Sequence, residues 1–137
     1  MGQAENPCSI LIVDDNEPMR LLLAHIVTQD LHAEVTLAGT CEDALRLATR
    51  DTYDVILLDL LMPGIGGFEV LKRIREGSVN RSTPVIVVSV RGTSVIVREE
   101  SVSIDRATTL GANAVVFKPF TNSQLILAVK EQLHAKV

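Results

Sequence analysis

VILLDLLMPGIGG, at residues 55–67, is the stretch that decides the predicted fold of this 137-residue chain. Residues 55–58 are all apolar, which is typical of a strand buried on both faces of a parallel sheet. Pro63 and Gly64 end the segment, because proline lacks a backbone donor and glycine tolerates a positive φ. Asp59 is therefore expected at the carboxyl end of a central strand, where open α/β sheets bind their ligands.

Apolar segments and helical patterns alternate along the rest of the chain. Residues 34–38 (EVTLA) alternate between polar and apolar positions, which predicts a strand at an edge of the sheet. Thr121 and Gln124 form a capping box, and Asn16 and Thr40 can cap two earlier helices. This alternation predicts the α/β class, with a doubly wound parallel sheet. The predicted strands are 9–13, 34–38, 55–58, 85–88 and 114–117, and the fourth helix is expected at about 98–110.

The composition is that of one globular domain, since 47% of the residues are hydrophobic and 22% are charged. Residues 1–7 are expected to form a short flexible lead and residues 8–137 the domain. The net charge of −4 disfavours direct contact with nucleic acid or an anionic membrane. No apolar run reaches the roughly 18 residues that cross a bilayer, so we expect a cytoplasmic location. Cys8 and Cys41 are expected to be thiols rather than a disulfide.

Polar side chains stand where four of the predicted strands end, namely Asp14 and Asp15, Asp59, Ser89 and Lys118. Because parallel strands end at one rim of a sheet, we expect these five residues to lie close together. Three neighbouring carboxylates raise one another's pKa values unless cations stand between them. One divalent cation together with Lys118 balances their charge, and carboxylate oxygens suit Mg²⁺ or Mn²⁺.

A carboxylate beside Mg²⁺, a lysine and a hydroxyl is arranged to accept a phosphoryl group. The ionised Asp59 would attack phosphorus in line without a general base, while the metal and Lys118 neutralise charge on the phosphoryl oxygens. Taken singly, each residue has an ordinary interpretation as a turn former, a helix cap, a surface hydroxyl or a solvated charge. The hypothesis rests on all five standing at strand ends of one β-α alternation.

Four segments carry a resemblance to a known family: LIVDDN at 11–16, DLLMPGIGG at 59–67, VVS at 87–89 and FKPF at 117–120. Together they resemble the receiver domain of bacterial two-component response regulators, and the likeness covers roughly residues 8–135. The resemblance implies a flavodoxin-like fold with strand order 2-1-3-4-5. It also implies a phosphorylation-dependent signalling switch rather than a metabolic enzyme, one that catalyses only its own phosphorylation and slow dephosphorylation.

The resemblance also implies roles for the acidic residues. Asp59 would accept a phosphoryl group from a histidine kinase or a histidine phosphotransfer protein. Asp15, Asp59 and the backbone carbonyl of Leu61 would ligate Mg²⁺, and Asp14 would act through a metal-bound water.

On the other strands, the resemblance implies that Ser89 moves towards the phosphoryl group and that Lys118 binds one of its oxygens. The Lys118–Pro119 bond is expected to be cis. Val115 departs from the family, which usually has Tyr or Phe there as a switch residue. Phe117, next to Lys118, is expected to point to the opposite face of the strand and so not to replace it. The connection across residues 90–110 is longer than usual by about two helical turns.

Two other classes of function stay open. An aspartate-based phosphatase of the dehalogenase type would need a second acid where Leu61 stands, and a flavodoxin would need a Ser/Thr/Gly-rich loop where residues 14–18 read DDNEP. A pseudo-receiver would bind partners without phosphorylation, and the non-aromatic Val115 favours it mildly. The expected partners are a kinase or phosphotransfer protein and an unidentified output protein or domain, without nucleic acid or membrane; a homodimer is left open.

Overall fold

Five parallel strands and five helices alternate along the chain in the computed structural model, which describes residues 7–62, 64, 66–90 and 104–135. The strands form one sheet in the order β2-β1-β3-β4-β5, which confirms the predicted flavodoxin-like fold and the edge position of β2. The elements are β1 (Ser9–Val13), α1 (Glu17–Leu31), β2 (Glu34–Ala38), α2 (Cys41–Arg50), β3 (Val55–Leu58), α3 (Gly67–Gly77), β4 (Val85–Val90), α4 (Ile104–Thr109), β5 (Ala114–Lys118) and α5 (Asn122–Ala135).

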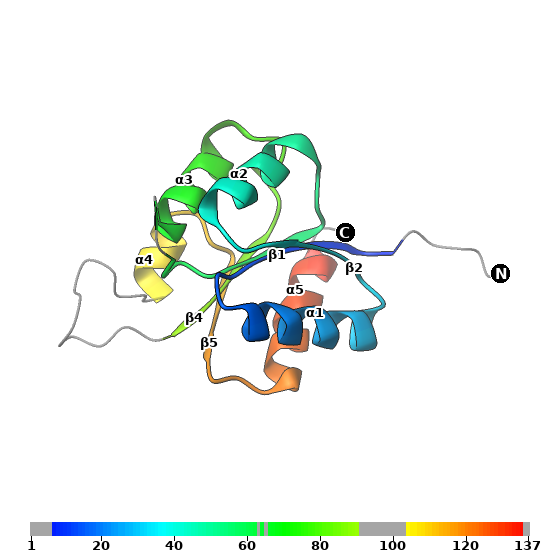
Figure 1. Cartoon of the computed structure of the whole chain (residues 1–137). Coiled ribbons are helices and arrows are strands. Elements are labelled where there is room, and N and C mark those ends of the chain that lie inside the picture. The colour runs from blue at the N-terminus through cyan, green and yellow to red at the C-terminus, as the bar shows by residue number, and fades with distance from the viewer. Residues whose placement is uncertain (1–6, 63, 65, 91–103, 136–137) are drawn as a thin grey trace.

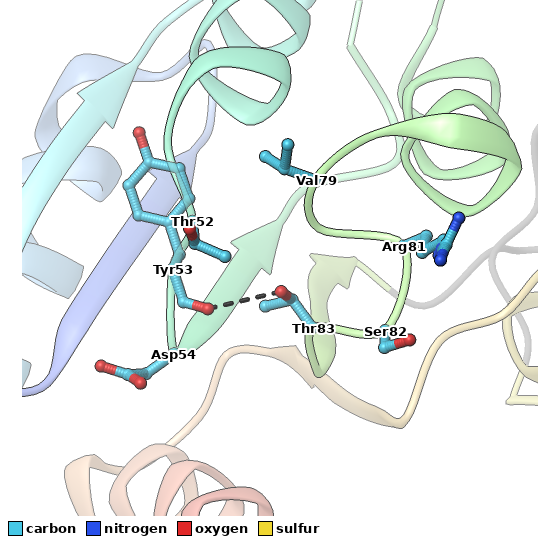
Figure 2. Close-up of a pocket in the computed structure, with 7 residues that line it drawn as sticks. All are labelled: Thr52, Tyr53, Asp54, Val79, Arg81, Ser82 and Thr83. Carbon is cyan, nitrogen blue, oxygen red and sulfur yellow. Dashed lines mark hydrogen bonds between the residues drawn. The ribbon is translucent and has the colours of Figure 1, made fainter.

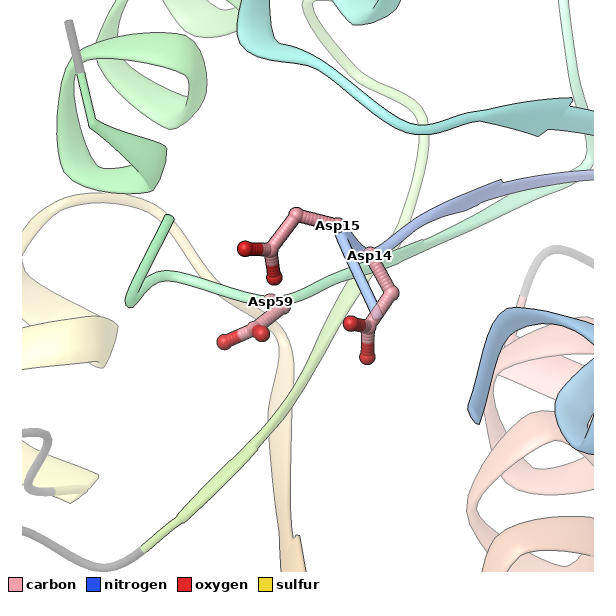
Figure 3. A group of neighbouring side chains, drawn as sticks. All are labelled: Asp14, Asp15 and Asp59. Atoms are coloured by element: carbon pink, nitrogen blue, oxygen red, sulfur yellow. The ribbon is translucent and has the colours of Figure 1, made fainter. Parts of the chain in front are cut away.

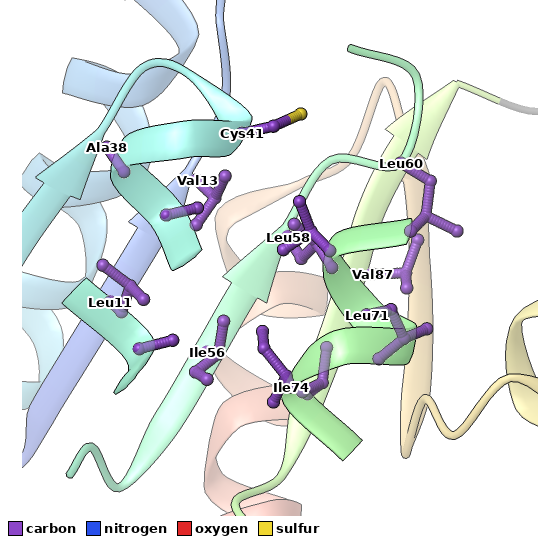
Figure 4. Packing of buried hydrophobic residues seen from close by; sticks show 14 of the residues in the cluster. Leu11, Val13, Ala38, Cys41, Ile56, Leu58, Leu60, Leu71, Ile74 and Val87 are labelled. Carbon is purple, nitrogen blue, oxygen red and sulfur yellow. The ribbon is translucent and has the colours of Figure 1, made fainter. Parts of the chain in front are cut away.

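Helices cover both faces of the sheet, with α2 and α3 over one face and α1 and α5 over the other (Figure 1). In β3, Ile56 and Leu58 face the first layer, while Val55 and Leu57 face the second. All four are at most 1% exposed, which explains why this strand has no polar alternation. Figure 4 shows the first of these two cores, in which β1, β3 and β4 pack against α2 and α3.

Side-chain caps hold the turns that lead into α1, α2 and α5. Asn16 accepts a hydrogen bond from the Met19 amide at 2.9 Å, and the Thr40 hydroxyl accepts one from a backbone amide in the first turn of α2. Thr121 and Gln124 bond each other's backbone amides at 2.9 and 3.1 Å, which confirms the capping box. These caps fix where α1, α2 and α5 begin, and α1 and α5 follow strand ends that carry polar residues; α3, with Gly66 at its N-cap, has no side-chain cap.

The boundaries differ from the prediction at two strands. β4 and β5 continue to Val90 and Lys118, because their ladder pairs Ser89 with Phe117 and Val90 with Lys118. Ser89 and Lys118 therefore lie in the last two residue pairs of the β4–β5 ladder rather than after it. The expected lead at residues 1–7 and most of the long connection after β4 fall outside the described residues. Cys8 and Cys41 are not joined in a disulfide, as predicted.

Arg75, near the end of α3, ties together the two loops that precede β4 and β5. Its guanidinium is partly desolvated, which lowers its pKa from the usual value. The planar group donates to several acceptors at once, which a lysine ammonium does not reproduce. The acceptors are Thr83 O at 2.7 Å, Asn113 Oδ1 at 2.8 Å, Gly111 O at 2.9 Å, Arg81 O at 3.0 Å and Asn80 O at 3.3 Å.

We expect Arg75→Lys to lower the free energy of unfolding by about 1.5–3 kcal/mol, because several acceptors lose a charged donor. Arg73→Lys is the matched control on the same helix: Arg73 is half-exposed and, among the described residues, pairs with Glu69 alone, at 2.9 Å. Its cost should stay below about 0.5 kcal/mol. Urea unfolding of both variants measures the difference, and equal small effects would contradict the role given to Arg75.

Candidate functional site

Three carboxylates meet at the carboxyl ends of β1 and β3 (Figure 3). Asp14 and Asp15 follow β1, and Asp59 follows β3. One oxygen from each carboxylate lies within 4.8 Å of the others. Asp14 and Asp59 are 1% and 5% exposed, whereas Asp15 is exposed to solvent. Two nearly buried acids and one accessible acid thus share a small volume at this rim.

The backbone holds Asp59 in place on two sides. Its amide donates to the Val13 carbonyl at 2.9 Å, which extends the pairing of β1 and β3 by one residue. On the other side the first residue of α3, Gly67, lies against the backbone of Asp59 and Leu60, so closely that a Cβ atom there would overlap both. The glycine that ends the 55–67 stretch is therefore needed for α3 to pack against the loop that follows β3.

The two oxygens of Asp59 have different surroundings. Oδ1 accepts a hydrogen bond from the Ser89 hydroxyl at 2.6 Å and another from the Leu61 amide at 3.0 Å. Oδ2 faces the Lys118 ammonium at 3.5 Å. One oxygen is thus oriented by two donors, while the other faces a cation and has no hydrogen bond within the described part of the chain.

Lys118 lies closer to Asp14 than to Asp59. Its Nζ is 2.8 Å from Asp14 Oδ2, and its side chain is 15% exposed. The other oxygen of Asp14 accepts the Asn16 amide at 2.9 Å. The peptide bond between Lys118 and Pro119 is cis.

Burial raises the pKa of Asp59 from its usual value, and the charge of Asp14 adds to this effect. The Ser89 hydroxyl, the Leu61 amide and the Lys118 ammonium act in the opposite direction but do not cancel it. Ionised Asp14, Asp15 and Asp59 with Lys118 carry −3 + 1 = −2 charges, which one divalent cation would balance. Hard carboxylate oxygens with an open, solvent-facing side fit Mg²⁺, which keeps several of its waters.

All five residues singled out at the strand ends are brought together at this rim. The expectation that Phe117 points to the opposite face of the strand, away from the side of Val115, is wrong. Val115 and Phe117 both pack against the core under α2 and α3, because residues two apart in a strand share a face. Phe117 is also the cross-strand partner of Ser89. Sequence reasoning missed Arg20, whose guanidinium donates to the Asp14 carbonyl at 2.8 Å; nothing in its local pattern indicates that contact.

A separate hollow of about 390 Å³ lies at the other end of the sheet, before β3 and β4 (Figure 2). Thr83 donates there to the Tyr53 carbonyl at 3.3 Å, which joins the two segments that lead into these strands. The segments are residues 52–54 and 79–83. Because Asp59 follows β3 and this hollow precedes it, the hollow is not part of the carboxylate site.

Comparisons with known proteins agree with this geometry. The family model for the response regulator receiver domain matches residues 10–130. Transcriptional regulatory protein ResD of Bacillus subtilis is 32% identical over 128 residues, which cover 93% of this chain and 49% of ResD. The "Probable chemotaxis protein CheY" of Rhizobium etli is 31% identical over 88% of each chain. This chain therefore spans about half the length of ResD and most of the chemotaxis protein.

Two solved structures show the same fold. Chemotaxis protein CheY4 of Vibrio cholerae is 30% identical with a TM-score of 0.76, covering 93% of this chain and all of that one. The receiver domain of sensor histidine kinase PA1611 from Pseudomonas aeruginosa is 26% identical with a TM-score of 0.76, over 94% and 99% of the two chains. That structure is described with a magnesium ion coordinated in its active-site cleft. Within the residues described here, no helix is long and apolar enough to cross a membrane.

Replacing the buried acid should stabilise the metal-free protein. Folding raises the pKa of Asp59 from its ordinary value of 3.8, so the folded state favours the protonated carboxyl. The stability that this preference contributes is fully present below pH 3.8 and is lost as the pH rises through the folded-state pKa. We expect Asp59→Asn to raise the thermal unfolding midpoint by a few degrees at pH 7, and by less as the pH falls towards 4. The exposed Asp30→Asn is the control. A thermal unfolding midpoint of Asp59→Asn below that of the wild type at pH 7 would contradict the destabilisation assigned to the buried Asp59 carboxylate.

Proposed function

Because the chain belongs to the response regulator receiver family, we propose that it is a phosphorylation-dependent signalling switch with Asp59 as the phosphoacceptor. The observation that carries this proposal is the asymmetry of Asp59: two donors orient Oδ1 and leave Oδ2 towards Lys118. An acceptor needs one carboxylate oxygen free to attack while the other stays fixed. The expected donor is a phosphohistidine of a histidine kinase or of a phosphotransfer protein.

In the proposed reaction, Asp59 Oδ2 forms a bond to phosphorus while the bond between phosphorus and the donor's imidazole nitrogen breaks. The electron pair of that bond stays on the imidazole, and no proton has to leave Asp59 because the carboxylate is ionised. The geometry supports Oδ2 as the nucleophile because Ser89 and the Leu61 amide already hold Oδ1. Lys118, which lies between Asp14 and Asp59, is placed to bind a phosphoryl oxygen once it arrives.

A divalent cation is part of the proposal. Asp15, Asp59 and the backbone carbonyl of Leu61 would hold Mg²⁺, with Asp14 acting through a bound water. When bound, the ion supplies positive charge that offsets the charge on the transferring phosphoryl oxygens. The carboxylates provide the oxygen donors, and Asp15, as the exposed member, leaves the site open to solvent and to a donor protein.

The signal would pass from Ser89 to the surface around β4 and β5. After transfer, Ser89 would hydrogen-bond a phosphoryl oxygen instead of Asp59 Oδ1. Phe117 lies opposite Ser89 in the neighbouring strand and on the same face as Val115. A shift of Ser89 would therefore first change the packing around Phe117. An output protein or domain would recognise the altered surface, as in other bistable switches driven by phosphorylation.

The proposed unit runs from residue 8 to residue 137 and acts in the cytoplasm. It would catalyse its own phosphorylation and slow dephosphorylation without turning over a metabolite. The pseudo-receiver alternative predicts the same fold and the same protein contacts but no phosphoryl transfer.

Intact mass after incubation with Mg²⁺ and acetyl phosphate tests the proposal. We expect the wild type to gain one phosphoryl group, Asp59→Asn to gain none, and Asp30→Asn to behave as the wild type. Removal of Mg²⁺ with EDTA should abolish the gain. A folded, Mg²⁺-loaded wild type that gains no mass would favour the pseudo-receiver, and a gain in Asp59→Asn would place the acceptor elsewhere.

A further inference from the structure

Arg20, on the second turn of α1, is bound to the turn that carries the two acids after β1. Its Nη1 donates to the backbone carbonyl of Asp14 at 2.8 Å. Its side chain is 18% exposed, and its ion pair with Glu17 is long, at 4.0 Å. The hydrogen bond to the Asp14 carbonyl is therefore the main polar contact that this guanidinium makes among the described residues.

Gly39, just after β2, provides the space in which the guanidinium lies. A Cβ atom built on Gly39 would be 2.7 Å from Arg20 Nη1 and 3.2 Å from its Cζ. Gly39 does not have the positive φ that favours glycine at Gly64, Gly66 and Gly111, so its backbone would accept an alanine. The absence of a side chain at residue 39 is thus explained by the arginine and not by the backbone.

The contact matters because Asp15 has little else to hold it. Asp14 is fixed by Lys118, by the Asn16 amide and by its own amide, which donates to the Ala38 carbonyl at 3.1 Å. The carboxylate of Asp15 makes no hydrogen bond or ion pair within the described part of the chain. Its position near Asp14 and Asp59 is consequently set by the backbone of the turn, and Arg20 holds that backbone at its first peptide.

We propose that Arg20, seated on Gly39, is a positioning residue that holds the turn after β1 so that Asp15 converges with Asp14 and Asp59. This inference rests on the proposed function, in which Asp15 is a metal ligand. Arg20 touches neither the metal nor the phosphoryl group; it acts through the Asp14 carbonyl. A guanidinium suits this role because it is flat enough to lie on a glycine and presents its donors in a fixed plane.

Two substitutions test the contact from opposite sides. Arg20→Gln replaces the guanidinium by a neutral amide on a side chain two atoms shorter, and Gly39→Ala leaves the arginine intact but displaces its guanidinium. Because alanine at residue 39 meets only the end of a flexible side chain, this second variant should keep the fold even if the first does not. Glu17→Gln controls for the charge beside Arg20, and Gly77→Ala controls for a Gly→Ala change at a site with nothing within 4 Å.

The readouts are the Mg²⁺ dissociation constant of the unphosphorylated protein, by calorimetric titration, and amide hydrogen exchange of residues 14–17 without metal. We expect both test variants to bind Mg²⁺ about tenfold more weakly, as is typical when a group that orients a ligand is lost. Exchange in the turn should be faster in both, with control variants unchanged. A purely structural role would lower stability without this selective loss of Mg²⁺ affinity.

The outcomes separate the two proposals. Unchanged affinity and exchange in Arg20→Gln and Gly39→Ala, with a wild type that binds Mg²⁺, would overturn the positioning role alone. Tighter binding in Arg20→Gln would also overturn it, since Arg20 would then act only as a repelling charge. A wild type that binds no Mg²⁺ at millimolar concentration would overturn the proposed metal site and this inference with it.

Discussion

The ammonium group of Lys118 lies between the buried carboxylates of Asp14 and Asp59, and the rest of the site is arranged around this contact. Its distances to the two acids are 2.8 and 3.5 Å. Two carboxylates this close and this buried repel each other and lose hydration, so neither would be tolerated without a cation. One lysine leaves the group of three acids short of positive charge, and that deficit would give the proposed site its affinity for a divalent cation.

The order of the sheet makes this grouping achievable with short side chains. β1 and β3 are neighbours and supply the acids, β4 lies beside β3 and supplies Ser89, and β5 follows with Lys118. Each polar group therefore has only one or two strands to reach across. The helices on both faces bury the strands themselves, and the two buried carboxylates of the described residues, Asp14 and Asp59, lie at the rim where the strands end. The cost of buried charge is thus limited to the place where the proposed function requires it.

The strands, the helix starts and the meeting of polar residues at one rim were predictable, because they depend on the local pattern of apolar and polar residues. Apolar runs that end in polar residues identify the strands, and side-chain caps such as Asn16 fix where the helices start. Parallel topology then brings the strand ends together. The details that sequence reasoning missed depend on tertiary contacts: Lys118 prefers Asp14 to Asp59, and Arg75 gathers carbonyls from two distant loops. Phe117 was misplaced although the period of a strand puts it on the face of Val115.

Titration of the unphosphorylated wild type and Asp59→Asn with Mg²⁺, followed by thermal unfolding, tests most directly whether these strand ends form one cation site. A ligand that binds only the folded state stabilises it by an amount that grows with the logarithm of ligand concentration divided by Kd, and so raises the unfolding midpoint. We predict one Mg²⁺ per wild-type chain and a midpoint that rises with Mg²⁺ concentration, with an Mg²⁺ affinity about tenfold weaker and a smaller midpoint rise in Asp59→Asn. A folded wild type whose midpoint is unchanged by millimolar Mg²⁺, or equal responses in both proteins, would contradict the site described for Asp14, Asp15 and Asp59.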